Sequence, residues 1–513
     1  MQRFLHQGIG VEERTSRQQA IAGVEHRPTA FIGACQRGPE NQPVLISSFA
    51  DYEKTFGAVT TDTPLGYALR LYYLNGGGDA WVVRVARNAA AACIELPSDD
   101  VPLQLRSVCT GSHDYLRAAV DYDGIDRADG DCFNLTVQRL DKPGTETVIA
   151  QETFRYVSCA NSHPNNLPQT LARSQLVRCD LPCPGSRPHP TLNYRTGAAE
   201  YFTGITRPGK DGARITMADI LGSSADSSGL FALTEQYDFE QLYLPPISLQ
   251  TDLSVPLLRA AARICERRRA ILVADAPKSW DSVATALEKI EKFSLRGDNI
   301  ALYYPWIRVA EPVSRTPVTL PPGGAVAGTL SRLMLQQGPG STPAGQQVLL
   351  RGINRFAEKV DQASSYKLSQ KGINSLCHSK IGRKVIWDAV TLAPRDGKKD
   401  QITSLKVRRL LYFIGKSIES GLLWTAFEYN NEKLWKKIHD QVYAFLFELM
   451  KKGLLQGSVP DAAFTVHCDQ GSNPSSLRRQ NFAGLEIGVA PLLPSRFVRL
   501  SFRLAVAGAG EHR

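Results

Sequence analysis

Two cysteines and a histidine form the closest grouping of metal-ligating residue types in the sequence. Three residues separate Cys179 from Cys183, and His189 follows shortly after. Structural zinc sites usually take four Cys or His ligands from two close pairs, and no second close pair follows here. The other cysteines stand singly at irregular spacings, which is typical of free thiols in a reducing compartment. The pattern therefore favours free thiols over a metal centre.

Asp275 is the carboxylate best placed for catalysis. It ends the apolar run 271–275, and α/β enzymes often place catalytic groups where a parallel strand ends. The same position also suits a residue that begins a turn or a helix, and no second carboxylate or histidine stands at a readable offset. An α/β enzyme of unknown reaction is thus the alternative function, without a catalytic, cofactor-binding or metal-ligating residue to name.

The stretch GGAVAGTL (323–330) has the glycine spacing of a phosphate-binding loop but lacks the lysine that reaches the phosphates. A turn from a loop into a helix is the simpler interpretation. The surrounding residues 311–346 are rich in Pro and Gly, and they predict a loop region with one short helix at 327–335.

The charge balance is weakly basic. The 513 residues include 60 Lys or Arg and 50 Asp or Glu, so the formal net charge is +10. Nucleic-acid binding calls for a denser basic face with interleaved aromatic residues, whereas the basic run 262–269 predicts a helix with its charges on one side only. No apolar run reaches the roughly 20 residues that span a bilayer. The first residues lack the apolar core of a secretory signal.

The pattern of apolar residues predicts an α/β and α+β multidomain fold, with a mixed α/β core, long C-terminal helices, a small closing β-sheet and a β-rich inserted domain. Apolar runs such as TAFIGAC, ILVADAP and NIALYYPWIRV alternate with helical patterns, which predicts a mostly parallel sheet. The predicted parts are an N-terminal arm (1–22), the first part of the core (23–92), the insertion (93–240), the α/β domain (241–375), a helical C-terminal domain (376–495) and a C-terminal arm (496–513).

Several strings, in a fixed order, resemble contractile tail sheath proteins. In chain order, these strings include TAFIGACQRGPENQP, LGYALRLYYLNGGG, ALYYPWIRV, PPGGAVAG, KVRRLLYFIGKSIESG, VHCDQGSNPSS and GLEIGVAPLLPSRFVRL. Together they cover about 28–87 and 241–504. The chain resembles the single-chain sheaths of contractile phage tails, pyocins and extracellular contractile injection systems, whereas 93–240 matches nothing in that family.

The resemblance implies a structural protein and no enzyme. Sheath subunits stack as six-fold rings around an inner tube, and their contraction drives the tube through a target envelope. The implied partners are further copies of the chain, an inner tube protein, and baseplate and terminal cap proteins, with no cofactor, nucleic acid or membrane insertion. The resemblance also implies assembly in the bacterial cytoplasm, as a component of a phage tail or a phage tail-like particle.

The last predicted strand is a candidate contact between subunits, because its apolar residues alternate with polar ones at a chain end. The resemblance implies that this strand pairs with strands of another copy, beside an N-terminal arm of a further subunit. A meander within one chain is the alternative. The candidate inter-subunit residues are Val498, Leu500, Phe502, Leu504, Phe464, Val466, Leu485 and Ile487.

The helix predicted at 432–452 is a candidate contact with the tube. Its apolar stripe is Leu434, Ile438, Val442, Phe445 and Leu449. That stripe leaves Lys436, Lys437 and Lys451 free to reach outward, and residues 401–456 hold nine Lys or Arg against five Asp or Glu. The resemblance implies that these helices line the lumen, whereas an ordinary solvated face is the alternative. The insertion is expected to face outward.

Overall fold

The structure is a computed structural model that describes residues 20–60, 62–126, 129–191, 201–310, 316–393, 404–491 and 497–507. The chain divides into two compact units. The large unit comprises 27–338 and 342–394, and the C-terminal unit comprises 1–26, 339–341 and 395–513.

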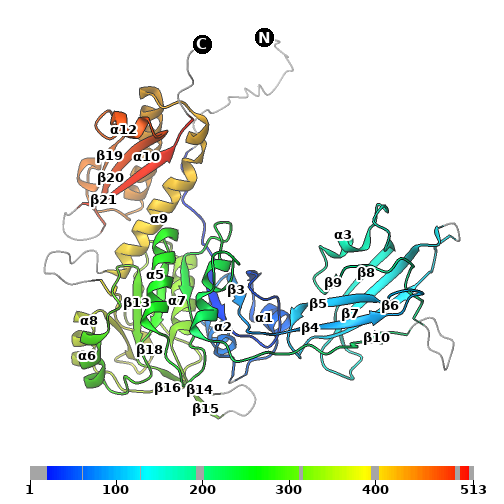
Figure 1. The fold of residues 1–513 in the computed structure, drawn as a ribbon. Coiled ribbons are helices and arrows are strands. Elements are labelled where there is room, and N and C mark those ends of the chain that lie inside the picture. Colours follow the sequence, from blue (N-terminus) through cyan, green and yellow to red (C-terminus); the bar gives the residue numbers. More distant parts are fainter. Residues whose placement is uncertain are drawn as a thin grey trace, which may run out of the picture. The chain divides into compact units, whose positions relative to one another are not determined.

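An eight-stranded sheet organises the large unit, in the order β18-β17-β13-β12-β11-β1-β3-β2 (Figure 1). The neighbours from β17 to β3 run parallel, and the two edge strands run antiparallel to their neighbours. Every residue of β1, β11 and β13 is buried, as expected of a parallel sheet with helices on both faces. The strands are β1 (Thr29–Gly33), β2 (Val44–Ile46), β3 (Ala80–Arg84), β11 (Gln241–Tyr243), β12 (Ile271–Asp275), β13 (Ile300–Tyr304), β17 (Ile373–His378) and β18 (Lys384–Ile386).

Helices pack on both faces of this sheet. α2 (Pro64–Leu74) and α7 (Gly323–Gln337) contact β1, β11 and β12, and α1 (Phe49–Phe56) packs beside α2. The helices that share a single hydrophobic cluster with the strands are α4 (Met217–Leu221), α5 (Val255–Arg268), α6 (Val283–Lys292) and α8 (Gln362–Gln370). Side-chain oxygens of Ser48, Ser282 and Asp361 cap the first turns of α1, α6 and α8.

Helix α7 is longer than the short helix predicted from the sequence, where its glycines suggested a loop. A Cβ atom on Gly324 would lie 2.4 Å from the carbonyl oxygen of Ala68, and one on Gly328 would lie 2.2 Å from that of Tyr72. The backbones of α7 and α2 are therefore in direct contact. This packing outweighs the low helix propensity of glycine.

The β-rich insertion follows β3 and contains two sheets around one hydrophobic cluster. The sheets have the orders β4-β5-β9 and β10-β6-β7-β8. Their elements are β4 (Ala91–Leu96), β5 (Leu103–Thr110), β6 (Tyr115–Asp121), β7 (Cys132–Leu140), β8 (Val148–Ser158), α3 (Leu167–Leu171), β9 (Val177–Cys179) and β10 (Thr203–Gly204).

The insertion ends before residue 240, the boundary predicted from the sequence. Ile220 in α4, Leu230 in η2 (Gly229–Ala232) and Phe239 are buried in the hydrophobic cluster of the eight-stranded sheet. These few apolar residues lie in short elements and show no helical period, so the sequence pattern did not connect them with the core. We use the term insertion for residues 91–210.

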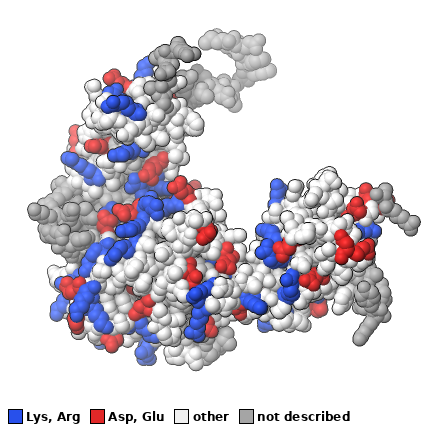
Figure 2. All heavy atoms as spheres, viewed as in Figure 1, with Lys and Arg blue, Asp and Glu red and all other residues white. Residues whose placement is uncertain are grey.

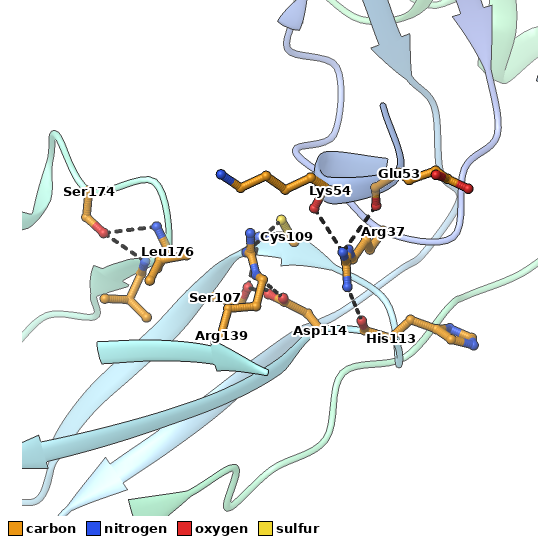
Figure 3. A network of polar contacts seen from close by, with 11 residues as sticks. Arg37, Glu53, Lys54, Ser107, Cys109, His113, Asp114, Arg139, Ser174 and Leu176 are labelled. Carbon is orange, nitrogen blue, oxygen red and sulfur yellow. Dashed lines mark hydrogen bonds and ion pairs between the residues drawn. The ribbon is translucent and has the colours of Figure 1, made fainter. Parts of the chain in front are cut away.

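Polar side chains hold the insertion to the sheet. Arg37 donates to the carbonyl oxygens of Lys54 (2.9 Å) and Glu53 (3.3 Å) in α1 and to that of His113 in the insertion (3.4 Å) (Figure 3). Arg84, at the end of β3, is 2% exposed and donates to the carbonyl oxygen of Gly38 (2.9 Å) and to the hydroxyl of Thr110 (2.5 Å). Both arginines thus connect the core and the insertion.

A buried ion pair stands beside this junction, inside the insertion. Nε of Arg139 lies 2.6 Å from Oδ1 of Asp114, and the Asp114 carboxylate also accepts from the hydroxyl of Ser107 (Figure 3). Both members of the pair are buried, and their hydrogen bonds offset the loss of water.

The predicted strand NIALYYPWIRV consists of two strands. β13 ends at Tyr304, and β14 (Ile307–Ala310) begins beyond Pro305 in a separate small sheet with β15 (Pro317–Leu320) and β16 (Arg355–Phe356). Proline has no backbone N–H to donate to a ladder, so it separates the two strands.

The C-terminal unit begins later than the boundary predicted at 376, because β17 and β18 complete the large sheet. Its β-sheet is an antiparallel meander in the order β19-β20-β21. Residues 20–26 join this unit, with the N–H of Val24 donating to the hydroxyl of Ser417 (3.0 Å). The predicted arm before residue 20 lies outside the described residues. The elements of the unit are α9 (Leu405–Gly421), η3 (Leu423–Phe427), α10 (Glu432–Lys451), α11 (Pro460–Ala463), β19 (Phe464–His467), α12 (Ser475–Arg478), β20 (Phe482–Val489) and β21 (Val498–Ala505).

A membrane-spanning helix would need a long apolar stretch, and no helix among the described residues has one.

Candidate assembly surfaces

The structure brings all eight candidate inter-subunit residues into the meander β19-β20-β21. Val466 pairs with Ile487, Ile487 also pairs with Leu500, and Leu485 pairs with Phe502. The apolar side chains share one face of the sheet. Phe464, Leu485, Ile487, Phe502 and Leu504 are buried, and Val466, Val498 and Leu500 are half-buried.

This apolar face packs on α10. The ring of Phe464 meets the ring of Tyr443 edge to face at 5.1 Å between centroids. All five residues of the predicted stripe on α10 are buried, together with Trp435, Gln441 and Leu446. The helical period therefore located the buried side of α10.

The last strand pairs within its own chain. Each residue of β20, from Phe482 to Val489, opposes a residue of β21, from Ala505 to Val498. This is the meander that the sequence left open as the alternative to pairing between subunits. The other edge of the sheet, β19, has no further strand partner in the described part of the chain.

The three candidate tube-facing lysines differ in their surroundings. Lys436 is exposed and forms no ion pair with a described residue. Nζ of Lys437 lies 3.1 Å from Oε1 of Glu428 and 4.0 Å from the centre of the Trp424 ring. Nζ of Lys451 lies 2.9 Å from Oε1 of Glu448. The expectation that all three are free is therefore wrong for Lys437 and Lys451. Glu428, on the segment before α10, pairs with Lys437, and Glu448, one turn away on α10, pairs with Lys451.

An exposed apolar patch that sequence reasoning missed lies on η3 and the residues after it. Leu423, Phe427 and Tyr429 are 72%, 87% and 61% exposed. The patch adjoins the end of β21, because the hydroxyl of Thr425 donates to the carbonyl oxygen of Ala505 (3.0 Å). Large exposed apolar side chains often mark contact surfaces. The available signal was the run LWTAFEY, whose aromatic residues fit neither a helical nor a strand period.

Asp275 is half-buried at the end of β12, where it acts as a structural hydrogen-bond acceptor. It accepts from the hydroxyl of Tyr243 (2.7 Å) and from the N–H of Gly323 (2.8 Å) at the start of α7. Burial raises the pKa of Asp275 to about 7, although both hydrogen bonds favour the charged form. The candidate catalytic carboxylate thus connects a strand to a helix, and the stretch GGAVAGTL, predicted as a turn into a helix, forms the first two turns of that helix.

The cysteine and histidine grouping is only partly assembled. Sγ of Cys179 and Sγ of Cys183 lie 3.1 Å apart, whereas Nε2 of His189 lies 3.3 Å from Oδ1 of Asp99. The described residues contain no group of three or more His, Cys, Asp or Glu side chains arranged to hold a metal ion.

The basic helix predicted at 262–269 is part of α5. Its apolar side, including Leu258, Ala261 and Cys265, is buried, and its exposed side presents Arg259, Arg263 and Arg267. Figure 2 shows Lys and Arg side chains gathered over the area where α5 lies in Figure 1. The arginines form a one-sided charged face with no interleaved aromatic residues on the helix, as the sequence predicts.

The sequence matches no protein-family model and no curated protein. Its fold, however, matches solved structures of sheath proteins along nearly the whole chain. The sheath tail protein of Listeria innocua has a TM-score of 0.64 at 14% identity, covering 95% of this chain and 96% of that one. The sheath complex of an extracellular contractile injection system, PVC, in the contracted state has a TM-score of 0.55 at 16% identity, with 98% of both chains covered. The contracted helical sheath of the anti-feeding prophage has a TM-score of 0.53 at 18% identity, with 98% and 99% covered. The chain therefore has the fold of contractile sheath proteins, as the sequence resemblance implied.

Proposed function

We propose that this chain is a structural sheath subunit that polymerises as stacked six-fold rings around an inner tube and contracts to drive the tube through a target envelope. The observation that best supports this proposal is the fold match, which covers at least 95% of this chain and of the sheath proteins compared. A match of that extent includes the C-terminal unit and the region of the insertion, so it concerns the whole architecture rather than a shared sheet.

The proposal implies that the purified chain forms tubes. Negative-stain microscopy of concentrated protein should show cog-like tubes of uniform diameter. Protein that stays monomeric at every concentration and salt condition, alone and together with its inner tube protein, would contradict the proposal.

The proposed contact between subunits is an exchange of β21. The slot beside β20 is filled by the chain's own β21 through eight opposed residue pairs. A β21 from another copy can make the same pairs, so exchange keeps the main-chain hydrogen bonds and is favoured by high local concentration. Such bonds persist while subunits rotate, because backbone pairing tolerates movement of the rest of each subunit.

A pair of engineered cysteines separates exchange from the closed meander. Glu486 and Ser501 oppose each other on the exposed face of β20 and β21. In a Glu486→Cys, Ser501→Cys variant, mild oxidation of assembled tubes should yield covalent ladders of subunits on a denaturing gel, and oxidation of monomers should yield closed monomers. The single variants are the matched controls. Closed monomers from assembled tubes would show that β21 stays in its own chain.

The proposed partners beyond the chain itself are an inner tube protein, a baseplate and a terminal cap. The α10 face with Lys436 is proposed to face the tube, because weak electrostatic contacts can hold an extended sheath and still release in sequence. The region 93–240 is proposed to face outward. Limited proteolysis of assembled tubes should therefore cut first within it, and a first cut inside 401–456 would reverse this orientation.

The proposed site of assembly is the bacterial cytoplasm, as a component of a phage tail or a phage tail-like particle. The free thiol state of all ten cysteines suits a reducing compartment. Fractionation of producing cells should recover the unassembled chain in the cytoplasmic fraction.

A further inference from the structure

We propose that Cys179 and Cys183 form a redox-sensitive thiol pair in the insertion, which closes into a disulfide in the presence of a low-molecular-weight disulfide oxidant. The inference rests on the insertion alone and does not depend on the proposed function.

Exposure singles out these two residues. The chain has ten cysteines, all free, and eight of them are buried. Cys179 and Cys183 are the two that are partly exposed, and their Sγ atoms lie only 3.1 Å apart. A disulfide bond is about 2.0 Å long, so closure needs a movement of about 1 Å. The two cysteines that are partly exposed are thus also the two whose sulfur atoms lie within reach of each other.

The N-terminal end of the short loop between them is fixed by β5. β9 pairs with β5 up to Cys179, and the N–H of Asp180 donates to the carbonyl oxygen of Gln104 (3.1 Å). The Asp180 carboxylate also accepts from Nε of Arg106 (2.8 Å). Cys179 is therefore held at the end of an anchored strand.

The C-terminal end is fixed by a turn around Asp100. Its carboxylate accepts from the N–H of Gly185 (2.7 Å) and from the hydroxyl of Ser186 (2.9 Å). Because Cys183 stands two residues before this anchor, both thiols are presented from fixed backbone. The order already present in the reduced state lowers the cost of closing the bond.

The reaction balances as two thiol–disulfide exchanges. The thiolate of one cysteine attacks a sulfur of the oxidant, forms a mixed disulfide and releases one small thiolate. The second cysteine then attacks the protein sulfur of the mixed disulfide, forms the Cys179–Cys183 bond and releases the second small thiolate. The two cysteine protons leave to solvent or to the departing thiolates. The pair is oxidised, and the oxidant is reduced to two thiols.

The environment also predicts the pH dependence and the choice of partner. Burial, and then the hydrogen bond with Cys183, raise the pKa of the Cys179 thiol well above its ordinary value, so closure should speed up as pH rises. Cys159 packs in the same hydrophobic cluster but is only 7% exposed, so a small oxidant reaches it less readily than it reaches the partly exposed pair.

The test uses the full chain and oxidised glutathione. After incubation, the remaining thiols are alkylated and the protein is digested with trypsin. The tryptic peptide 179–195 holds both cysteines and no other, since trypsin does not cut between Arg187 and Pro188. We expect this peptide to lose two hydrogens, to carry no alkyl group, and to regain both thiols on reduction with dithiothreitol.

Single substitutions identify the second step. Cys183→Ser and Cys179→Ser should each keep one glutathione on the remaining cysteine, because no second thiol displaces it. Cys159→Ser is the matched control and should still close the pair. Peptide 179–195 with both cysteines alkylated after oxidation, or cross-linked to the peptide that carries Cys159, would overturn the proposal. This readout on the unmodified chain decides the question even if a variant fails to fold.

Discussion

The eight-stranded sheet and the three-stranded meander of this chain face their surroundings differently. The large sheet has helices on both faces, and its central strands are buried throughout. The meander packs one face on α10 and leaves the other face to solvent, where it presents His467, Glu486 and Arg499. One edge strand of the meander, β19, pairs with β20 on one side and has no strand partner on its other side among the described residues.

This difference in how the two sheets are covered implies that they can change in different ways. A sheet covered on both faces can be taken apart only by unfolding the unit around it. A sheet with a solvated face and a terminal strand can open at one strand while its helix stays folded. The large unit is therefore expected to behave as a rigid body, and the meander is the part of the chain whose pairing the proposed exchange of β21 would change.

The largest effect is expected from Leu485→Ala, in the centre of the meander. Leu485 is fully buried, and truncation of a buried leucine costs about 2–5 kcal/mol. Hydrogen exchange should show faster exchange in 464–505 and unchanged protection in β12 and β13. Leu500→Ala, at a half-buried position in the same sheet, should have a smaller effect. Equal loss of protection in both sheets would mean that the two units unfold together.

The next effect is a pH dependence confined to the large unit. The folded pKa of Asp275, about 7, lies above its unfolded value, so the native state binds more protons between roughly pH 4 and pH 7. The free energy of unfolding should therefore fall as pH rises through that window, by an amount on the order of 4 kcal/mol. Denaturation in urea at several pH values should show this slope, and Asp275→Asn should remove most of it. A slope of the same size in the variant would assign it to other groups.

A smaller loss is expected from Gly328→Ala in α7. Alanine is the better helix former by about 1 kcal/mol, yet its Cβ would lie 2.2 Å from the Tyr72 carbonyl oxygen. The overpacking should win and destabilise the large unit by about 1–3 kcal/mol, measured by chemical denaturation. Gly204→Ala is the matched control, because an added Cβ there meets no neighbour. A stabilised Gly328→Ala variant would show that α2 and α7 can move apart.

The smallest effect is expected at the proposed tube-facing side of α10. Exposed ion pairs contribute only about 0–1 kcal/mol each, so Lys436→Glu should leave the fold intact and weaken extended sheath on its inner tube, more strongly at low salt, where the charges are less screened. Particle length measured by electron microscopy at several salt concentrations gives the readout. Lys292→Glu reverses a charge on α6 and should not shorten the particles. Full-length extended particles from Lys436→Glu at every salt concentration would remove this lysine from the tube contact.

The sequence located those parts of the fold in which one period runs through one element. The stripe on α10 is buried as its spacing predicts, and the apolar run 271–275 is a buried strand. Prediction failed where tertiary contact decides. The sequence predicts Gly323 and Gly324 as loop residues, yet both lie in α7, and the backbone of α2 approaches Gly324 so closely that only a residue without a side chain fits there.

The candidate assembly surfaces could be predicted only in part, because their contacts also depend on residues that are distant in the sequence. Alternation in 498–504 identifies a strand with one apolar face, but it does not specify whether the partner strand belongs to the same chain. The spacing of Lys437 and Lys451 places them off the apolar stripe, whereas their ion pairs depend on Glu428 and Glu448 lying within reach. The exposed side chains of Leu423 and Phe427 follow no period at all.

The guanidinium of Arg84 has a mechanical consequence. It is held between two parts of the chain: it donates to the carbonyl oxygens of Cys35 and Gly38, in the segment after β1, and to the hydroxyl of Thr110 in the insertion. Arg37 bridges α1 and the insertion in parallel with it. A force that pulls on the insertion is therefore distributed over several hydrogen bonds. It is transmitted to the large sheet at β1 and β3, which are interior strands of that sheet and not edge strands. Force applied to the insertion would turn the large unit as a whole before it could peel a strand from the sheet.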